Sequence, residues 1–462
     1  MFLTNTLSGK LEKFNPIRSG KVGLYVCGLT PYDLTHLGHA RVYVTFDIVR
    51  RTFEAASYEV CHVQNFTDID DKIIDRAKAR NTPPLDLATF YIEEYFRSID
   101  ALGVLRAHQY PRVTQHIPEV IEIIRKLIEG KFAYMAANGD VYYSVSRFGG
   151  YGKLSKRKTQ ELVAGVRVEV SSHKKEPLDF ALWKSASGES AGWDSPWGRG
   201  RPGWHIECSA MSTKYLGQPF DIHGGGQDLI FPHHENEIAQ SESAAGKPFA
   251  NFFMHNGFVT VNKEKMSKSL GNFFTLKDIY AKFDPAAVRY YLLTEHYRSP
   301  LDFSDQALFQ AKTALARLIE AVDLVAFYLK IQNEEPLKPA AGDLSDKIFE
   351  SLTQDFHTPK ALAYLQQWAG DVFESFKTKA LDGRRSRREL GDFLWAGRQL
   401  LGLDFGRETS AWPAGVQELL HQREELRKKK EFVQADAVRQ KITQQFGLIL
   451  EDTPYGSRLK KA

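Results

Sequence analysis

Near its start the chain alternates apolar runs with a segment of helical spacing. Residues 22–27 are a short apolar run that ends in Gly28, which predicts a buried strand, and residues 58–67 predict a second strand. Residues 38–53 between them place apolar side chains on one face, which predicts a helix. A strand, loop, helix and strand in this order are typical of the opening of a parallel α/β sheet. Ligands bind beyond the carboxyl ends of such strands, so we expect Cys27 and the loop at residues 30–39 to lie at a site.

The pattern changes twice further along the chain. Residues 131–200 hold short strand-like pieces at 141–145 and 167–170, which predicts an insertion into the sheet domain, and the α/β pattern resumes over residues 203–261. After Ser304, apolar residues recur every three or four positions, which predicts a long amphipathic helix. Further helices are expected at 344–353, 359–379 and 387–401, and residues 416–462 are expected to begin as a charged helix and end in a polar tail.

Composition narrows the class of protein. The 462 residues are 43% hydrophobic and 12% aromatic, which excludes a mostly disordered chain. No apolar run approaches the ~18 residues of a membrane span, and the first residues lack the apolar core of a signal peptide, so we expect a cytoplasmic protein without membrane contact. Three cysteines are too few for a disulfide framework.

The net charge of +4 is unevenly distributed. Residues 421–462 hold ten Lys and Arg against six Asp and Glu, so residues 1–420 carry 51 charges of each sign. A neutral body with a basic end favours contact with a polyanion at that end.

The tetrapeptide His36-Leu37-Gly38-His39 lies where the predicted loop meets the predicted helix. A helix N-terminus offers free N–H groups and a partial positive charge to a phosphate, and Gly38 permits close approach of the backbone. We expect the two histidines to share one helical face and donate to phosphate oxygens. The alternative is that they are polar caps of an ordinary helix.

A second motif is Lys265-Met266-Ser267-Lys268-Ser269, followed by Gly271 and Asn272, which are typical of a turn. Its two lysines are suited to charge that develops on a displaced triphosphate. Charge alone favours an ordinary solvated loop. Together, however, an H-x-G-H at a strand-to-helix turn and a K-M-S-K-S about 225 residues later resemble the signature pair of class I aminoacyl-tRNA synthetases. Leu37 stands where that signature usually has Ile.

Four residues of metal-ligating type fall near the predicted strand ends or on a predicted helix; they are Cys27, Cys208, His233 and Glu237. The last two are four apart, so a helix opened by Pro232 places them on one face. Two thiolates, an imidazole and a carboxylate suit Zn²⁺. His234 and Glu235 are equally eligible by composition, and two cysteines about 180 residues apart are more often core residues, so the residue types alone leave the site open.

Four stretches resemble the cysteinyl-tRNA synthetases: residues 65–72, 201–211, 221–242 and 255–272. The resemblance is dense over residues 20–305. It implies a monomeric enzyme that uses Mg²⁺ with ATP to join L-cysteine to tRNA(Cys) through a cysteinyl-adenylate. It also implies one zinc per chain, held by the four residues above and facing the substrate thiol, and it leaves Cys61 as a core residue. Zinc would supply selectivity over serine that side-chain size, worth roughly 1–3 kcal/mol, does not.

The resemblance implies roles for the other motif residues. His36, His39, Lys265 and Lys268 would stabilise charge on the phosphates, beside Gly38; Gly224, Gly225 and Asp228 would contact the adenosine; Thr67 and Trp204 would line the amino-acid pocket; Phe432 and Asp436 would meet the anticodon. Without the resemblance, the glycines are equally a simple turn, and the segment around Phe432 is more simply a solvated charged helix.

The expected fold is α/β, with a Rossmann-type parallel-sheet catalytic domain and an insertion, followed by a helical bundle and a small anticodon-binding domain. The expected divisions are the first catalytic half (1–130), the insertion (131–200), the second catalytic half (201–254), the region that holds K-M-S-K-S and contacts the tRNA stem (255–303), the helical bundle (304–401) and the anticodon-binding domain (402–462).

Three other functions compete with this one. A ligase that joins cysteine to an amino-sugar has the same active site but lacks the anticodon-binding end, and the basic C-terminal segment argues against it. A zinc hydrolase leaves K-M-S-K-S unexplained. A non-catalytic RNA-binding protein leaves both phosphate motifs without a purpose.

Overall fold

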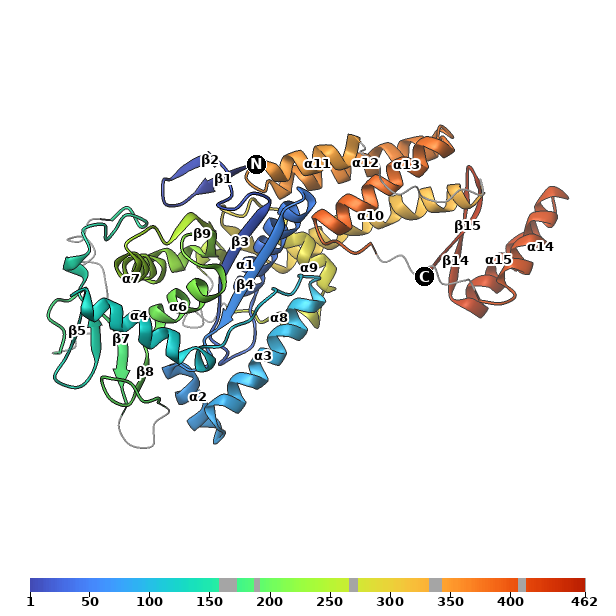
Figure 1. Cartoon of the computed structure of the whole chain (residues 1–462). Coiled ribbons are helices and arrows are strands. Elements are labelled where there is room, and N and C mark those ends of the chain that lie inside the picture. The colour runs from blue at the N-terminus through green and yellow to red at the C-terminus, as the bar shows by residue number, and fades with distance from the viewer. Residues whose placement is uncertain (158–172, 187–191, 266–272, 332–342, 406–412, 462) are drawn as a thin grey trace. The chain divides into compact units, whose positions relative to one another are not determined.

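Four parallel strands form the sheet on which the first part of the chain is built (Figure 1). The structure is a computed structural model that describes residues 1–157, 173–186, 192–265, 273–331, 343–405 and 413–461. Across the sheet the strands are β10 (Ala250–Asn256), β9 (Phe220–Gly226), β3 (Lys21–Leu29) and β4 (Glu59–Phe66), and all neighbouring pairs are parallel. The predicted α/β fold with a parallel sheet is therefore confirmed.

Helices cover both faces of this sheet. Successive residues of a strand point to opposite faces. Tyr25 of β3 packs on one face with Ile206 of α6 (Trp204–Leu216) and Ile238 of α7 (Glu235–Ala245). On the other face, Gly224 of β9 lies so close to Phe46 of α1 (Leu37–Ala55) that a Cβ at this position would come within 2.3 Å of the ring. Burial on both faces explains the apolar run within β3.

The insertion forms a second, antiparallel sheet. It follows α2 (Asp71–Arg80), α3 (Pro84–Ala101) and α4 (Ile117–Glu129), and its strands are β5 (Ala133–Met135), β6 (Val141–Tyr143), β7 (Phe180–Ser185) and β8 (Gly200–Pro202). The strand expected at 167–170 lies outside the described residues. Trp183 and Tyr143 of this sheet belong to the same buried cluster as Cys27 and Cys208, so the insertion shares the core of the main sheet.

A small three-stranded sheet follows β10. It comprises β11 (Val259–Val261), β12 (Glu264–Lys265) and β13 (Leu301–Phe303), with α8 (Leu276–Tyr280) and α9 (Pro285–Leu292) between the last two strands. Buried Arg41 connects this region to α1, because its guanidinium donates to the carbonyls of His296 and Ser299.

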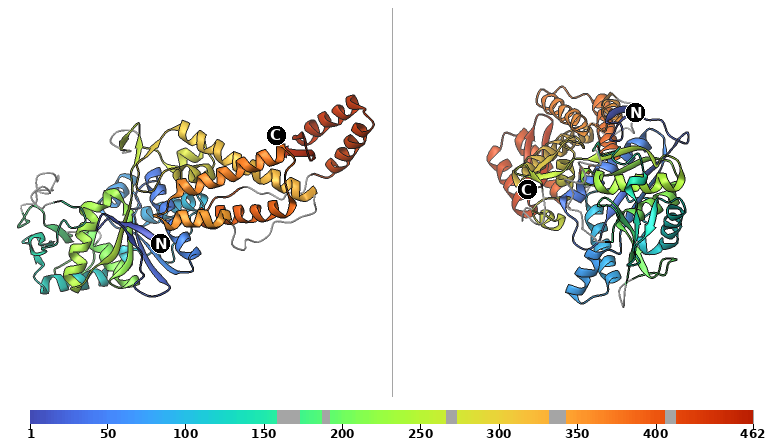
Figure 2. Two further views of the ribbon diagram at one scale, coloured as in Figure 1. Left: turned by 90° about the horizontal axis from the view of Figure 1, so that it is seen from above. Right: turned by 90° about the vertical axis from the view of Figure 1, so that its left-hand side faces the viewer.

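The chain then becomes helical, as expected. Figure 2 shows the yellow to orange helices running alongside one another; they are α10 (Asp305–Ile331), α11 (Asp343–Thr353), α12 (Thr358–Lys377) and α13 (Gly383–Trp395). The apolar positions that predicted α10 are all buried: Leu308, Ala311, Leu315, Leu318, Val322 and Val325. Helix α13 begins earlier than expected because the Asp382 side chain caps it, accepting from the Arg385 N–H at 2.7 Å.

The C-terminal end is a helix pair followed by a hairpin. Its elements are α14 (Val416–Lys428), α15 (Phe432–Phe446), β14 (Leu448–Thr453) and β15 (Gly456–Lys461). The prediction of a polar tail was therefore wrong. Alternate residues of the hairpin, Leu448, Leu450 and Leu459, are buried. Arg458 is only 5% exposed and pairs with Glu320 of α10 at 2.6 Å, so charged residues here fasten the hairpin.

The described chain divides into two compact units. The first comprises Met1–Lys312, Phe349–Ala361 and Gln399–Leu403, and the second comprises Thr313–Ile348, Leu362–Arg398 and Asp404–Ala462. The finer division at residues 130, 200, 254, 303 and 401 stays a prediction. Among the described helices, none is both long and apolar enough to cross a lipid bilayer.

Candidate active site

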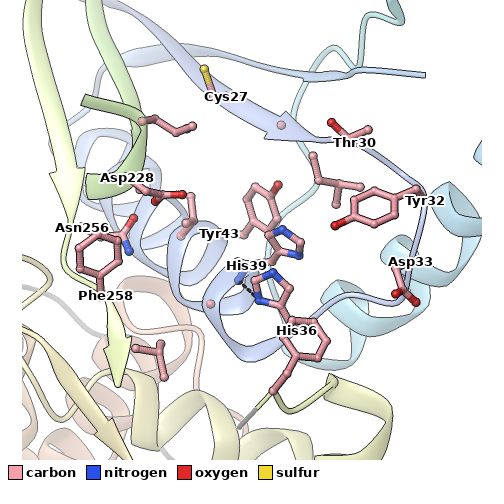
Figure 3. Close-up of a pocket in the computed structure, with 18 of the residues that line it drawn as sticks. Cys27, Thr30, Tyr32, Asp33, His36, His39, Tyr43, Asp228, Asn256 and Phe258 are labelled. Atoms are coloured by element: carbon pink, nitrogen blue, oxygen red, sulfur yellow. Dashed lines mark hydrogen bonds between the residues drawn. The ribbon is translucent and has the colours of Figure 1, made fainter. Parts of the chain in front are cut away.

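A cavity of about 550 Å³ opens at the carboxyl ends of β3, β9 and β10 (Figure 3). This is the edge of a parallel sheet at which ligands bind, and the volume suits a small-molecule site. Its lining includes residues from four places: Cys27 and Thr30 at the end of β3, Gly38 and His39 of α1, Asp228 after β9, and Asn256 at the end of β10. The predicted position of the site agrees with this cavity.

The end of β3 is held in place by a close backbone contact. A Cβ on Gly28 would lie 1.5 Å from the carbonyl oxygen of Asn65, so only glycine fits here. The Gly28 N–H donates to Asn65 Oδ1 at 2.9 Å, which ties β3 to β4. The contact fixes the backbone immediately after Cys27.

His36 and His39 lie at the start of α1, but only one is in the helix. His36 is the N-cap residue, with extended backbone (φ −113°, ψ 169°), and its Nδ1 accepts from the His39 N–H at 3.3 Å. The prediction that the two histidines share one helical face is therefore wrong, because His36 precedes the helix. The two rings instead stack, with centroids 3.5 Å apart, and both line the cavity. The N-terminal N–H groups of a 19-residue helix therefore face the cavity with two imidazoles beside them.

Cys27, Cys208, His233 and Glu237 come together in the structure, each from a different turn or element of the first unit. Phe231 is non-helical (φ −139°, ψ 131°), so the helical turn that carries His233 begins at Pro232, as expected. The two sulfurs lie 3.9 Å apart, Cys27 Sγ lies 3.7 Å from Glu237 Oε1, and His233 Nε2 lies 3.1 Å from the same oxygen.

These separations fit a tetrahedral metal ion. With Zn–S near 2.3 Å and Zn–N and Zn–O near 2.1 Å, the edges of a tetrahedron are about 3.8 Å between two sulfurs, about 3.6 Å between sulfur and oxygen, and about 3.4 Å between nitrogen and oxygen. The observed distances are within a few tenths of an ångström of these values. The donor set and its spacing therefore fit Zn²⁺.

A second set of four shares two members with the first. His223 and His234 can replace Cys208 and His233, because Cys27 Sγ lies 3.3 Å from His234 Nε2 and His223 Nε2 lies 2.9 Å from Glu237 Oε2. The first set contains two thiols, which Zn²⁺ favours. It also leaves His223 to orient the carboxylate of Glu237 from its far side, as outer partners of metal ligands commonly do. Sequence reasoning did not single out His223 as a partner of Glu237. The available signal is the strand period of two, which places His223 on the same face of β9 as Asp221.

Burial disfavours the charged forms of the side chains in this cluster. It raises the pKa of the Cys27 thiol and of the Glu237 carboxyl, and it lowers the pKa of the His233 imidazole. Burial thus disfavours the thiolate, the carboxylate and the imidazolium in this cluster. A divalent cation reverses this preference for the acids, because it stabilises thiolate and carboxylate directly.

Trp204 contacts the cluster and also lines the cavity. Its ring centroid lies 4.2 Å from that of His233, and it lines the cavity with 42% of its surface exposed. The second ring nitrogen of His233 is held by His205, because the Nδ1 atoms of the two residues lie 2.9 Å apart. Thr67 is buried and donates to Glu207 Oε2 at 2.8 Å, and it is not among the residues that line the cavity. The substrate contacts of Trp204 and Thr67 stay predictions.

The glycine run at residues 224–226 belongs to β9 itself and does not form a turn after it. Gly224 packs on Phe46, and a Cβ on Gly225 would lie 2.9 Å from Leu229. Gly226 and Asp228 line the cavity, whereas Gly224 and Gly225 are not among its lining residues. The predicted contact of Gly224, Gly225 and Asp228 with adenosine stays a prediction.

The remaining predicted residues are Lys265, Lys268, Phe432 and Asp436. Lys265 is the last residue of β12, and its backbone pairs with Thr260; Lys268 lies outside the described residues. In the second unit, Phe432 begins α15 with 58% of its surface exposed, and Asp436 is exposed one turn later on the same face.

The prediction that Cys61 is a core residue was wrong. It lies in β4, as expected, but it is exposed. Strand β4 is at the edge of the main sheet, and its first residues alternate, so that Val60 and His62 point inward and Cys61 points outward. The three cysteines thus divide into two buried thiols at the cluster and one at the surface.

Comparison with known proteins identifies the family. The family model "tRNA synthetases class I (C) catalytic domain" matches residues 13–313. The chain is 48% identical to a cysteine–tRNA ligase of Moorella thermoacetica over 479 aligned residues, with all of both chains covered. It is 46% identical to the cysteine–tRNA ligase of Aquifex aeolicus, with 99% of this chain and 98% of the relative covered.

Solved structures support the fold. Methionyl-tRNA synthetase of Mycobacterium tuberculosis bound by methionyl-adenylate superposes with a TM-score of 0.61 at 16% identity, covering 84% of this chain and 93% of that one. A leucyl-tRNA synthetase of Agrobacterium radiobacter in a ternary complex superposes with a TM-score of 0.59 at 12% identity, covering 85% and 84%. With the family model and the full-length relatives, these similarities place the chain in the cysteine–tRNA ligase family of class I aminoacyl-tRNA synthetases.

Proposed function

We propose that this enzyme charges tRNA(Cys) in two steps within the cavity described above. The carboxylate of L-cysteine attacks the α-phosphate of ATP, which gives cysteinyl-adenylate and pyrophosphate. The 2′-OH of the terminal tRNA ribose then takes the acyl group, and the acyl–phosphate bond breaks with release of AMP. One observation carries the proposal: Cys27 both lines the cavity and belongs to the buried cluster of two thiols, an imidazole and a carboxylate, so a thiol-selecting group opens directly onto the substrate space.

In this proposal cysteine is selected by Zn²⁺, and the zinc ligands are Cys27, Cys208, His233 and Glu237. When bound, Zn²⁺ binds a deprotonated thiol strongly and an alcohol poorly, which distinguishes cysteine from serine. The chain contributes rigidity: His205 holds the far nitrogen of His233, and His223 holds the far oxygen of Glu237. Trp204 covers His233 on the cavity side and is the proposed contact for the amino acid.

The phosphates belong at the start of α1. The helix N-terminus favours negative charge there, and Gly38 lets a phosphate approach the backbone. His36 and His39 line the same part of the cavity and donate to the phosphate oxygens as charge develops. Lys265 and Lys268 complete this group in the proposal, and Mg²⁺ accompanies ATP. No nucleophilic side chain is needed, because positioning and charge stabilisation supply the acceleration.

The second unit provides the proposed contact with the anticodon. Exposed Phe432 follows a run of three lysines at residues 428–430. An exposed ring beside basic residues suits stacking on an unpaired base with nearby phosphate contacts. Asp436, one turn along α15, lies where it can accept from the edge of that base. The proposal includes a monomer that works in the cytoplasm, as the resemblance implies.

The proposed activity is tested by amino-acid-dependent exchange of pyrophosphate into ATP. With each of the twenty amino acids in turn, we expect exchange with L-cysteine and about 10⁴-fold less with L-serine, because a site built to ligate a thiol leaves its groups unsatisfied by an alcohol. Exchange without acylation of tRNA, but with acylation of an amino-sugar, would favour the amino-sugar ligase. Absence of cysteine-dependent exchange would contradict the proposal, and zinc-dependent hydrolysis without ATP would favour a hydrolase.

The metal-ligand set is tested by zinc content after removal of loosely bound metal. Cys208→Ala and His233→Ala are expected to lose the zinc, because each removes one of four donors. His223→Ala is expected to keep it at saturating zinc with about 10- to 100-fold weaker affinity, since His223 acts through Glu237. Cys61→Ala is the matched control, because it removes an exposed thiol. Loss of zinc in His223→Ala with retention in Cys208→Ala would establish the second set instead.

The anticodon contact is tested by Phe432→Ala. Stacking on one base is worth about 1–3 kcal/mol, so kcat/KM for tRNA acylation should fall about 5- to 150-fold while pyrophosphate exchange stays unchanged. Phe309→Ala is the matched control, because Phe309 has the same 58% exposure. Equal losses in both variants, or a loss of exchange in Phe432→Ala, would refute the assignment.

A further inference from the structure

His234 contacts the cluster but fits poorly as one of its metal ligands. Its Nε2 lies 3.3 Å from Cys27 Sγ and 3.9 Å from Glu237 Oε1. A nitrogen and an oxygen that share one tetrahedral Zn²⁺ lie about 3.4 Å apart, so the second distance is about 0.5 Å too long. His233 Nε2, by contrast, lies 3.1 Å from the same oxygen. The short distance from His234 to Cys27 is instead that of a hydrogen bond between a ring nitrogen and sulfur.

The other ring nitrogen of His234 also has a partner. His234 Nδ1 lies 2.8 Å from His255 Nε2, near the end of β10. His255 Nδ1 lies 2.9 Å from the hydroxyl of Thr6, which follows β1 (Phe2–Asn5). Thr6, His255 and His234 therefore form a histidine chain, a row of hydrogen bonds that begins near the N-terminus and ends on Cys27.

Packing leaves the ring of His234 little room to turn. A Cβ on Gly225 would lie 3.1 Å from its Cε1, so glycine at this position makes space for the ring. On the other side the ring stacks on His223, with centroids 4.2 Å apart. These contacts hold Nε2 against Cys27 and Nδ1 against His255.

The sulfur decides the direction of every hydrogen bond in the histidine chain. A thiolate that binds a cation has no proton and can only accept, so His234 Nε2 must carry a proton and donate it. Both rings are buried, which disfavours a doubly protonated imidazolium, so His234 Nδ1 accepts. His255 Nε2 is then the donor to it, and His255 Nδ1 accepts from the Thr6 hydroxyl.

A hydrogen bond to Cys27 has two physical consequences. It stabilises negative charge on a sulfur that water does not reach, where an unpaired charge is costly. It also draws electron density from the sulfur, so the thiolate donates less to a bound cation. The cation then keeps more positive charge for a further thiolate.

We infer that Thr6, His255 and His234 are positioning residues, which hold one tautomer of His234 so that its Nε2–H donates to the Cys27 thiolate and favours binding of the substrate thiol. The inference rests on the proposed function, because it concerns the same Zn²⁺ and the same substrate. It places His234 outside the set of ligands, a question that the residue types alone left open.

The whole enzyme loaded with Co²⁺ in place of Zn²⁺ tests the last hydrogen bond of the chain, because sulfur-to-cobalt charge-transfer absorption reports on the bound sulfurs. His234→Leu removes the N–H, so the band should move to longer wavelength, since a sulfur without its hydrogen bond gives up electron density more readily. The affinity for Zn²⁺ should fall about 10- to 100-fold. His234→Gln, which offers an amide N–H, should recover part of both.

Two results with His234→Leu would overturn the inference. An unchanged absorption band with an unchanged affinity for Zn²⁺ would show that His234 does not act on Cys27. A change in the number of ligands, measured by zinc X-ray absorption, would make His234 a metal ligand.

Thr6→Val tests the far end of the chain, even if His234→Leu fails to fold. It removes the hydroxyl that donates to His255, so the band should move in the same direction by a smaller amount, and Thr6→Ser should behave as the wild type. Thr294→Val is the matched control, because Thr294 is also partly buried and donates one hydrogen bond, to the Tyr291 carbonyl. No shift in Thr6→Val, or an equal shift in Thr294→Val, would contradict the chain.

Cysteine-dependent pyrophosphate exchange by the wild type separates this inference from the proposed function. If the wild type binds zinc and catalyses exchange, an unchanged band in His234→Leu refutes the histidine chain alone. If the wild type shows no exchange with L-cysteine, the proposed function fails and this inference fails with it.

Discussion

The site depends on the convergence of four ionisable side chains in a dry core. Cys27, Cys208, His233 and Glu237 approach one another to within 4.8 Å, and each is at least 96% buried. Burial raises the pKa of the Cys27 thiol and of the Glu237 carboxyl and so disfavours their ionised forms, and a cation among the four would stabilise thiolate and carboxylate. The packing that enforces this convergence is unusually strict: Asn65 excludes any side chain at Gly28, and His205 and His223 hold two of the four from behind.

The rest of the cavity is arranged around that cluster by the parallel sheet. Because β3, β9 and β10 end at one edge, a single cavity meets a metal-ligating thiol, the N-terminus of α1 and the amide of Asn256. The first two of these groups suit a substrate thiol and a triphosphate. The proposed chemistry needs the thiol and the triphosphate to be held in a fixed arrangement, and the positions of the strand ends provide it. Preorganised positioning of this kind is the main source of rate enhancement in adenylate formation.

How much the sequence predicts depends on how local each feature is. Strands β3 and β4 and helix α1 follow from hydrophobic periodicity, so their prediction was confirmed. The pairing of Cys27 with Cys208, separated by 181 positions, has no local signal and came only from the family resemblance. His36 as an N-cap, the packing of Gly224 on Phe46 and the outward face of Cys61 depend on tertiary contacts that residue types do not specify.

The central claim is that the cluster binds zinc and that the zinc contacts the substrate thiol. Zinc K-edge X-ray absorption of the whole enzyme tests it directly, because sulfur and lighter ligands scatter differently. The account predicts two sulfur ligands and two nitrogen or oxygen ligands in the free enzyme, one additional sulfur on addition of L-cysteine, and no change on addition of L-serine. A single sulfur in the free enzyme, or an unchanged spectrum with L-cysteine, would contradict it.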